Sequence, residues 1–244
     1  MLNTVFFQLE KLFSKLQGKG WGTGTVAREL ACAAELLAGK TPELCIDIGG
    51  NKGLYTAEIL KAFPKCDVVV FEPAQSNLDI LRKQFNGQSN VTIVPSAVSD
   101  ADGEAVLFSN EAGSGLASLT KRRLDHFDID LHIQEPVKTI RFETFWQETL
   151  GGKNIGICKL DIEGHELSAL SGFGEALGSI DVIQFEFGGC NIDTRTFFQD
   201  FWYFFTENGF DVYRISPIGL APITKYNEAE ENFRTTNYLA KRRH

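Results

Sequence analysis

A short glycine-rich stretch lies where an apolar run gives way to a helical pattern. It reads Asp47-Ile48-Gly49-Gly50-Asn51-Lys52-Gly53. Glycine in such a position permits a tight turn and lets a ligand approach the backbone, and the following helix start offers unpaired N–H groups. A strand, a glycine turn and a helix in this order are typical of a nucleotide site, so the stretch predicts nucleotide binding.

A second acidic residue indicates which nucleotide. Glu72 ends the next apolar run, 23 residues beyond Gly49, and a carboxylate at a strand end can accept hydrogen bonds from both ribose hydroxyls. An NAD fingerprint requires glycine where this chain has Asn51 and Leu54. Asp47 at the first strand tip would repel a pyrophosphate but attract the α-ammonium of S-adenosylmethionine. The pattern therefore favours S-adenosylmethionine over a dinucleotide.

Positions beside these acids complete the predicted cofactor site. Pro73 follows Glu72, and Ser96-Ala97 lies just after the third apolar strand, where this architecture would close over the adenine. The predicted cofactor-binding residues are Asp47, Gly49, Gly50, Asn51, Gly53, Glu72, Pro73, Ser96, Ala97 and Asp161.

Titratable residues crowd the exit of another apolar strand, in the stretch Lys159-Leu160-Asp161-Ile162-Glu163-Gly164-His165-Glu166. Asp161 and Glu163 are predicted to orient the methionine part of the cofactor and an acceptor hydroxyl. His165, with an unperturbed pKa of about 6.5, is the natural candidate to take the hydroxyl proton. A purely structural acidic helix start is the alternative, and we prefer it for Glu166. The predicted catalytic residues are His165, Asp161 and Glu163.

Glu186 interrupts the apolar strand that follows. A carboxylate is costly to bury unpaired, so this side chain is expected to face the site, where it would bind the acceptor. Asp161, Glu163 and Glu186 could together hold Mg²⁺ through oxygen ligands. That alternative is not favoured, and the predicted site includes no metal.

Apolar runs of strand length alternate with helical patterns from Leu44 onward, which implies a parallel sheet covered on both faces. The expected fold class is α/β: a doubly wound, mostly parallel sheet of the Rossmann-like type with an N-terminal helical extension. Gly39 and Pro42 close the extension. The chain is therefore expected to divide into residues 1–40 and a nucleotide-binding domain at 41–244.

The N-terminal stretch 2–16 spaces apolar side chains at three and four residues, which predicts an amphipathic helix. Three interpretations stay open: a lid over the cofactor, a dimerisation arm, or a membrane-surface helix that presents Lys11, Lys15 and Lys19. The lid is preferred. The aromatic stretch 197–205 offers a second surface for a homodimer, or else an apolar wall of the substrate site.

The regular alternation lapses between Asp100 and Ile140. Within this stretch, the excursion from Ser109 to Glu135 is an insertion of the kind that often forms an acceptor pocket or its lid. The basic run Lys121-Arg122-Arg123 in this segment could receive an anionic acceptor, with a solvated loop as the default explanation. His126 and His132 of the same segment are predicted, together with Glu186, to bind substrate.

Composition argues against several classes of function. A formal net charge of -8 disfavours a nucleic-acid partner, which needs a basic surface. The five cysteines form no CxxC pair, which favours a reducing, cytoplasmic location. No run approaches the roughly 18 apolar residues of a membrane span, so any membrane contact is expected to be peripheral.

The chain resembles the FkbM family of S-adenosylmethionine-dependent methyltransferases over residues 44–240. The motifs that carry the resemblance are Cys45 to Gly53, Phe71-Glu72-Pro73, Asn90 to Ser99 and Lys159 to Glu166. The resemblance implies a seven-stranded methyltransferase sheet with an antiparallel last strand, and methylation of hydroxyl oxygens on polyketides, sugars or glycolipids. The family usually carries alanine at the position of Gly50, and it tolerates other residues at the position of His165.

Three functions remain to be separated. The leading hypothesis is an O-methyltransferase that moves a methyl group from S-adenosylmethionine to a hydroxyl of a sugar, glycolipid or polyketide-type metabolite. One alternative is an NAD-linked oxidoreductase, since doubly wound sheets host many chemistries. The other is a non-catalytic nucleotide-binding module, which the intact Asp161, Glu163 and His165 argue against.

Overall fold

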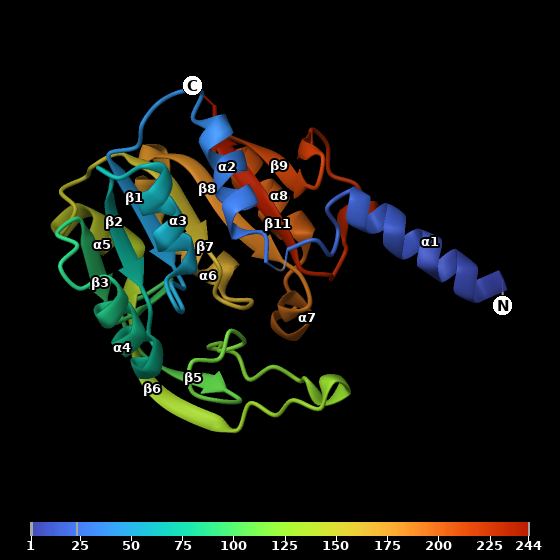
Figure 1. Ribbon diagram of the computed structural model, residues 1–244, viewed down its shortest axis with the longest axis horizontal. Helices are drawn as coiled ribbons and strands as arrows, with labels where there is room; N and C mark the ends of the chain where they lie inside the picture. Colours follow the sequence, from blue (N-terminus) through green and yellow to red (C-terminus); the bar gives the residue numbers. More distant parts are fainter. Residues whose placement is uncertain (1, 23, 244) are drawn as a thin grey trace.

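An eight-stranded mixed sheet forms the centre of the computed structural model, which describes residues 2–22 and 24–243 (Figure 1). The strand order is β10-β9-β11-β8-β7-β1-β2-β3. The strands from β3 to β8 are parallel to one another, and β11 runs antiparallel to both of its neighbours. The bounds are β1 (Leu44–Ile48), β2 (Asp67–Phe71), β3 (Val91–Val94), β7 (Ile155–Leu160), β8 (Ile180–Phe187), β9 (Phe210–Ser216), β10 (Gly219–Pro222) and β11 (Thr236–Arg242).

The doubly wound α/β fold is confirmed, with one strand more than expected. All seven expected strands are present, and the eighth is β10, which extends the sheet beyond β9. The chain reverses between them in a tight turn, where the Ser216 hydroxyl donates to the Gly219 carbonyl oxygen at 2.7 Å and Gly219 has a φ of +129°. A four-residue strand that ends in Pro222 has too little apolar alternation to be recognised in the sequence.

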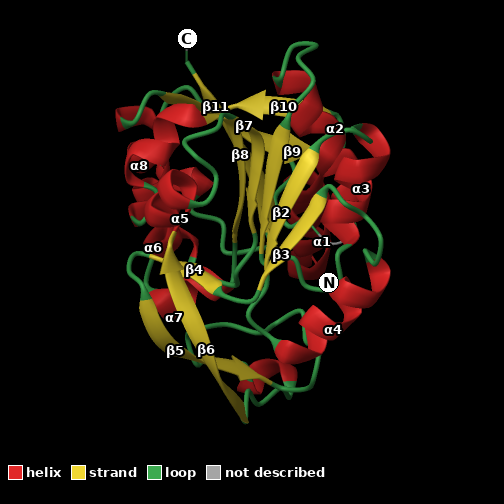
Figure 2. Ribbon diagram, turned by 90° about the vertical axis from the view of Figure 1, so that its left-hand side faces the viewer, coloured by secondary structure: helices red, strands yellow, loops and turns green. Residues whose placement is uncertain are grey.

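Two helical layers cover the sheet (Figure 2). The bounds of the helices on one face are α2 (Val26–Leu36), α3 (Leu54–Ala62) and α4 (Gln75–Gln84), and those on the other are α5 (Phe142–Glu148), α6 (Glu166–Ser171) and α8 (Phe198–Glu207). Successive side chains of a strand point to opposite faces of the sheet. In β1, Ile46 and Ile48 therefore belong to the hydrophobic core beneath α5, α6 and α8, while Cys45 belongs to the core beneath α2 and α3. Asp47 therefore points to the same side as Cys45, toward α3.

A second, three-stranded sheet lies below the carboxyl edge of the main sheet in Figure 1. It consists of β4 (Ala97–Ser99), β6 (Ile133–Arg141) and β5 (Gly103–Ser109), in that order. The segment 110–132 between β5 and β6, called the insertion below, carries the short helix η1 (Asp125–Phe127). The small sheet thus holds the predicted acceptor segment opposite the strand ends where a ligand binds.

The two N-terminal helices differ in their packing. Helix α2 is part of the core, because Leu30, Cys32 and Ala33 are buried against the sheet. Helix α1 (Leu2–Leu16) projects away from the rest of the molecule (Figure 1), and its apolar side chains from Val5 to Leu16 are exposed. In the part of the chain that the structure describes, no helix has both the length and the hydropathy needed to cross a membrane.

Candidate active site

A cavity of about 750 Å³ opens at the carboxyl edge of the main sheet. Its walls come from the loop after β1, the ends of β2, β7 and β8, the insertion, and the segments just before α2 and β11. This is the edge at which open α/β sheets bind ligands, and the volume lies within the range of small-molecule sites. The insertion lines the cavity with residues 114–119, Arg122 and Phe127.

The glycine loop forms one wall of this cavity. The backbone N–H groups of Gly49 and Gly50 both donate to the Phe71 carbonyl oxygen, at 2.9 and 3.0 Å. Gly49 has a φ of +84°, and a Cβ there would lie 2.0 Å from the carbonyl oxygen of Asp161. A Cβ at Gly50 would lie 2.2 Å from Val70 Cγ1, so this loop packs closely against the neighbouring strand β2.

Glu72 is buried at the end of β2 and anchors the same loop. One carboxylate oxygen accepts from the Asn51 N–H at 2.7 Å and the other from the Ala74 N–H at 2.9 Å. Burial raises the pKa of Glu72, and these two hydrogen bonds oppose that rise. Glu72 lines the cavity, so the carboxylate is held rigidly where a ligand's hydroxyl groups can reach it.

Asn77 is a cavity residue that the sequence motifs did not indicate. It lies in the first turn of α4, its exposed fraction is 1%, and its Oδ1 has no hydrogen-bond partner among the described residues. A buried acceptor without a partner is costly unless a ligand or water supplies the donor. Its position five residues after Glu72 was the available signal.

Asp47 lies beneath the cavity and does not line it. Its Oδ2 accepts from the Thr56 hydroxyl at 2.6 Å, and its Oδ1 is buried without a partner among the described residues. Lys159, for which the sequence alone indicates no role, lines the cavity and donates to Asp161 Oδ2 at 3.0 Å. Burial alone would lower the pKa of Lys159, but Asp161 and Asp47 outweigh it and raise that pKa. Asp47 therefore acts on the cavity through Lys159.

The predicted acidic residues meet at the exits of β7 and β8. Asp161, Glu163 and Glu186 each offer an oxygen within 4.8 Å of the others, and all three line the cavity. Burial, and then the charge of Asp161, raise the pKa of Glu163 to about 8. Burial also raises the pKa of Glu186, and the charges of Asp161 and Glu163 add to this effect. Such oxygens can bind hydroxyl groups, an ammonium group or a divalent cation.

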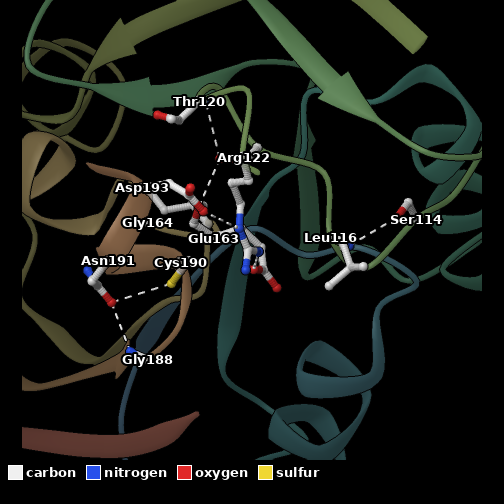
Figure 3. Close-up of polar contacts among 12 residues, drawn as sticks. Ser114, Leu116, Thr120, Arg122, Glu163, Gly164, Gly188, Cys190, Asn191 and Asp193 are labelled. Atoms are coloured by element: carbon white, nitrogen blue, oxygen red, sulfur yellow. Dashed lines mark hydrogen bonds and ion pairs between the residues drawn. The ribbon is translucent and has the colours of Figure 1, made fainter. Parts of the chain in front are cut away.

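Arg122 ties the insertion to this acidic cluster, as Figure 3 shows. Its guanidinium pairs with Glu163 and, at 3.6 Å, with Asp193 in α7 (Cys190–Thr194). The Ser118 hydroxyl adds a 2.8 Å hydrogen bond to the Glu163 carbonyl oxygen. Arg122 is 8% exposed, whereas the side chain of neighbouring Arg123 is 87% exposed. The basic run therefore contributes one buried, neutralised arginine to the cavity.

His165 lines the cavity at the start of α6. Its Nε2 lies 3.0 Å from the hydroxyl of Ser99, at the end of β4. Burial lowers the pKa of His165, and the nearby charge of Asp100 partly opposes this effect. Glu166, in the next position, accepts from the backbone N–H groups of Ile162 and Gly164. Those bonds hold the loop before α6, which agrees with a structural role for Glu166.

The cavity brings most of the predicted residues together. Gly49, Gly50, Asn51, Glu72, Pro73, Ser96, Ala97, Asp161, Glu163, His165 and Glu186 all line it. Gly53 does not; its φ is +78°, and a Cβ there would lie 2.7 Å from the Phe85 ring, so it serves the packing of α4. Neither His126 nor His132 reaches the cavity: His126 packs against Phe127, and His132 faces the Asp130 carbonyl oxygen.

Comparison with known proteins agrees with this geometry. The doubly wound sheet, the glycine loop after β1, the acid at the end of β2 and the acidic exit of β7 form the arrangement expected of a methyltransferase-type α/β protein. A family model for the methyltransferase FkbM domain matches residues 47–212. Because this match spans more than half of the 244 residues, the chain belongs to the FkbM methyltransferase family.

Individual relatives are distant. Methyltransferase 1 of Beauveria bassiana (strain ARSEF 2860) is 21% identical over 143 residues, which are 52% of this chain and 57% of that protein. An FkbM methyltransferase structure from Methylobacillus flagellatus KT is 15% identical with a TM-score of 0.49, covering 82% of this chain and 43% of the other. The structure of SMU.1697c from Streptococcus mutans in complex with SAH is 10% identical with a TM-score of 0.47, covering 88% of this chain and 97% of the other. This chain thus spans about half the length of the first two.

Proposed function

We propose that the protein is an S-adenosylmethionine-dependent O-methyltransferase that acts on a hydroxyl group of a small molecule. The observation that carries the proposal is that one cavity contains two groups of residues. The first group is the glycine loop with Glu72, and the second is the acidic exit of β7 with His165. When bound, S-adenosylmethionine supplies an electrophilic methyl group on a sulfonium sulfur. Its volume and that of an acceptor's reacting end are compatible with a cavity of about 750 Å³.

The residues of the first group fit an adenosine. Glu72 presents a fixed carboxylate for ribose hydroxyls, and the unpartnered Oδ1 of Asn77 needs a donor that the ligand would supply. Gly49 leaves the loop open to a ligand, because no side chain projects from it. We propose that Gly49, Gly50, Asn51, Glu72, Pro73, Ser96 and Ala97 contact the cofactor, with Asn77 added.

Local charge favours a cationic donor over NAD. Four carboxyl groups, those of Asp161, Glu163, Glu186 and, beneath them, Asp47, lie near only two cations, Lys159 and Arg122. Burial and mutual proximity raise the pKa values of Glu163 and Glu186, so a cationic ligand bound among them would stabilise their ionised forms. The ammonium and sulfonium of S-adenosylmethionine would be attracted to such a region. A pyrophosphate on the glycine loop would instead lie beside Asp161, whose backbone touches Gly49. An NAD-linked oxidoreductase is accordingly the weaker proposal.

His165 supports transfer to an oxygen acceptor. Because burial lowers its pKa, the imidazole is neutral near pH 7 and can take a proton. As the acceptor oxygen forms its bond to the methyl carbon, the hydroxyl proton moves to His165, and the carbon–sulfur electron pair stays on sulfur. The enzyme contributes mainly by placing the acceptor in line, a task suited to Asp161, Glu163 and Glu186.

The acceptor would enter past the insertion. Leu116, Leu119 and Phe127 line the cavity on that side, and Phe127 is 64% exposed at the rim. An exposed aromatic ring can stack on the apolar face of a sugar, while Glu163 and Glu186 can bind sugar hydroxyls. Sugars, glycolipids and polyketide-type metabolites with a free hydroxyl are therefore the acceptor classes to be screened first.

A transfer assay tests the proposal. Purified protein would be incubated with S-adenosylmethionine labelled with ¹³C in the methyl group and panels of these acceptors, and products would be analysed by mass spectrometry and NMR. The expected product carries a labelled methoxy carbon, and His165→Gln should slow its formation. A labelled methyl on nitrogen or carbon would overturn the assignment to oxygen. Binding of the cofactor without transfer to any acceptor would favour a non-catalytic module.

A further inference from the structure

A hydroxyl group sits between the proposed base and a carboxylate. Ser99, 7% exposed at the end of β4, donates its hydroxyl proton to Asp100 Oδ1 over 2.9 Å. The same oxygen lies 3.0 Å from His165 Nε2. The contact joins residues 66 positions apart in the chain, so it depends on the docking of the small sheet against α6.

Counting protons decides which nitrogen of His165 carries hydrogen. A serine hydroxyl has one proton, and an ionised carboxylate only accepts. The hydrogen bond from Ser99 lowers the pKa of Asp100, so this carboxylate is ionised at neutral pH. Since the Ser99 proton is directed to Asp100, the serine oxygen presents a lone pair to His165. Nε2 must then be the protonated nitrogen, and the basic lone pair resides on Nδ1.

The other side of the ring agrees with this assignment. Within residues 2–22 and 24–243, no protein group forms a hydrogen bond with His165 Nδ1, and the residue lines the cavity while Ser99 does not. The nitrogen that lacks a protein partner is thus the one that is free to meet a ligand. An acceptor hydroxyl could donate to it without displacing any protein contact.

We infer that Ser99 and Asp100 are positioning residues which hold neutral His165 as its Nε2–H tautomer, so that Nδ1 receives the acceptor's hydroxyl proton. The inference rests on the proposed function for its catalytic meaning, but the tautomer itself is a property of the folded protein. In the transfer step, the proton passes from the acceptor oxygen to Nδ1 while that oxygen bonds the methyl carbon and sulfur keeps the electron pair. The imidazolium that forms faces Asp100 through Ser99.

NMR of protein labelled with ¹⁵N-histidine reports the tautomer of His165 directly and does not require the protein to be catalytically active. The sample is the full chain saturated with S-adenosylhomocysteine at a pH above 8, and His165→Gln assigns the signal among the four histidines. We expect His165 to show a protonated Nε2 and an unprotonated Nδ1. His132 is the internal reference, because its Nδ1 faces the Asp130 carbonyl oxygen at 3.1 Å and must carry the hydrogen in that contact.

Two substitutions test the role of the pair. In Asp100→Ala the Ser99 hydroxyl is free to donate to Nε2, so the Nδ1–H form of His165 should gain population while the His132 signal stays unchanged. Because the wrong tautomer cannot accept the proton, kcat should fall about ten-fold with the KM for S-adenosylmethionine unchanged. Ser99→Ala should lower kcat similarly, and Ser99→Thr, which keeps the hydroxyl, should restore it.

Asp211→Ala is the matched control, since it removes an exposed carboxylate on β9. A protonated Nδ1 in the wild type would overturn the inference even in an active enzyme. So would an unchanged tautomer and kcat in both Asp100→Ala and Ser99→Ala. An Nε2–H signal that responds to Asp100→Ala, in a protein that methylates no acceptor, would support the positioning role and count against the proposed function alone.

Discussion

The carbonyl oxygen of Asp161 lies only 2.0 Å from where a side-chain carbon on Gly49 would be. The glycine loop after β1 and the acidic exit of β7 are therefore in direct backbone contact, although they are separated by more than 100 residues of sequence. The two motifs that the sequence presents separately form a single surface. A change in either one alters the position of the other.

Gly49→Ala should weaken binding of S-adenosylhomocysteine by at least about ten-fold, because the loop must move away from Asp161 and the backbone must adopt a left-handed φ, a strain of about 1–3 kcal/mol. Gly151→Ala is the control, since Gly151 also has a positive φ but a Cβ added there would have nothing within 4 Å. Calorimetry compares the two. Equal losses of affinity would mean that the Gly49–Asp161 contact has no part in binding.

Asn77→Leu separates binding from stability. The free protein loses an acceptor that has no partner, together with the side-chain hydrogen bond from Asn77 that lowers the pKa of Glu72, so its Tm should fall only modestly. Affinity for S-adenosylhomocysteine should fall about ten-fold. Thermal unfolding with and without the ligand measures both quantities. A lower Tm with unchanged affinity would assign Asn77 to the packing of α4 instead.

Arg122→Met should loosen the insertion. The substitution leaves Glu163 and Asp193 without their cation, and breaking a buried pair costs roughly 3 kcal/mol. We expect faster proteolysis within residues 110–132 and a higher KM for the acceptor. Arg123→Met removes an exposed charge next to it and should do neither. If the two variants behaved alike, the ion pairs of Arg122 would not hold the insertion.

Methyl transfer should lose rate as the pH falls. The base works only when unprotonated, and burial holds the pKa of His165 below its ordinary 6.5. The step that belongs to His165 is thus expected below about pH 6.5, with activity declining as the pH falls through it. In His165→Gln that step should vanish and kcat should drop by about 10²–10⁴. A step that persists in the variant would identify a different base.

Chelation should leave activity intact. Lys159 and Arg122 already pair with Asp161 and Glu163, two of the three carboxylates that could hold Mg²⁺. The rate measured in excess EDTA should therefore equal that measured with added magnesium. Inactivation by EDTA, reversed by Mg²⁺ and lost in Glu186→Gln, would instead make this cluster a metal site.

Much of the fold could be predicted because its signals are local. The turn at Gly49, the acid at Glu72 and the stretch from Asp161 to His165 each follow an apolar strand, and parallel strands deliver their carboxyl ends to one edge. Seven of the strands were recognised for the same reason. The Rossmann-like arrangement follows from that alternation.

Contacts between distant segments could not be predicted. Nothing near Arg122 in the sequence indicates that it enters the cavity while Arg123 stays in solvent, because the difference depends on Glu163 and Asp193. Ser99 likewise meets His165 only after the small sheet docks. Asp47 points toward α3 because of strand alternation, so it lies beneath the cavity and its charge acts on Lys159, which lines the cavity.

The most direct test of the central claim is the identity of the cofactor. Calorimetric titrations of wild-type protein and Glu72→Ala would be run with S-adenosylmethionine, S-adenosylhomocysteine and NAD. Micromolar binding of both sulfur nucleosides, lost in the variant, with no heat from NAD, is the expected result. Binding of NAD in preference to them, or no binding of either nucleoside, would contradict the assignment of the glycine loop and of the cavity built on it.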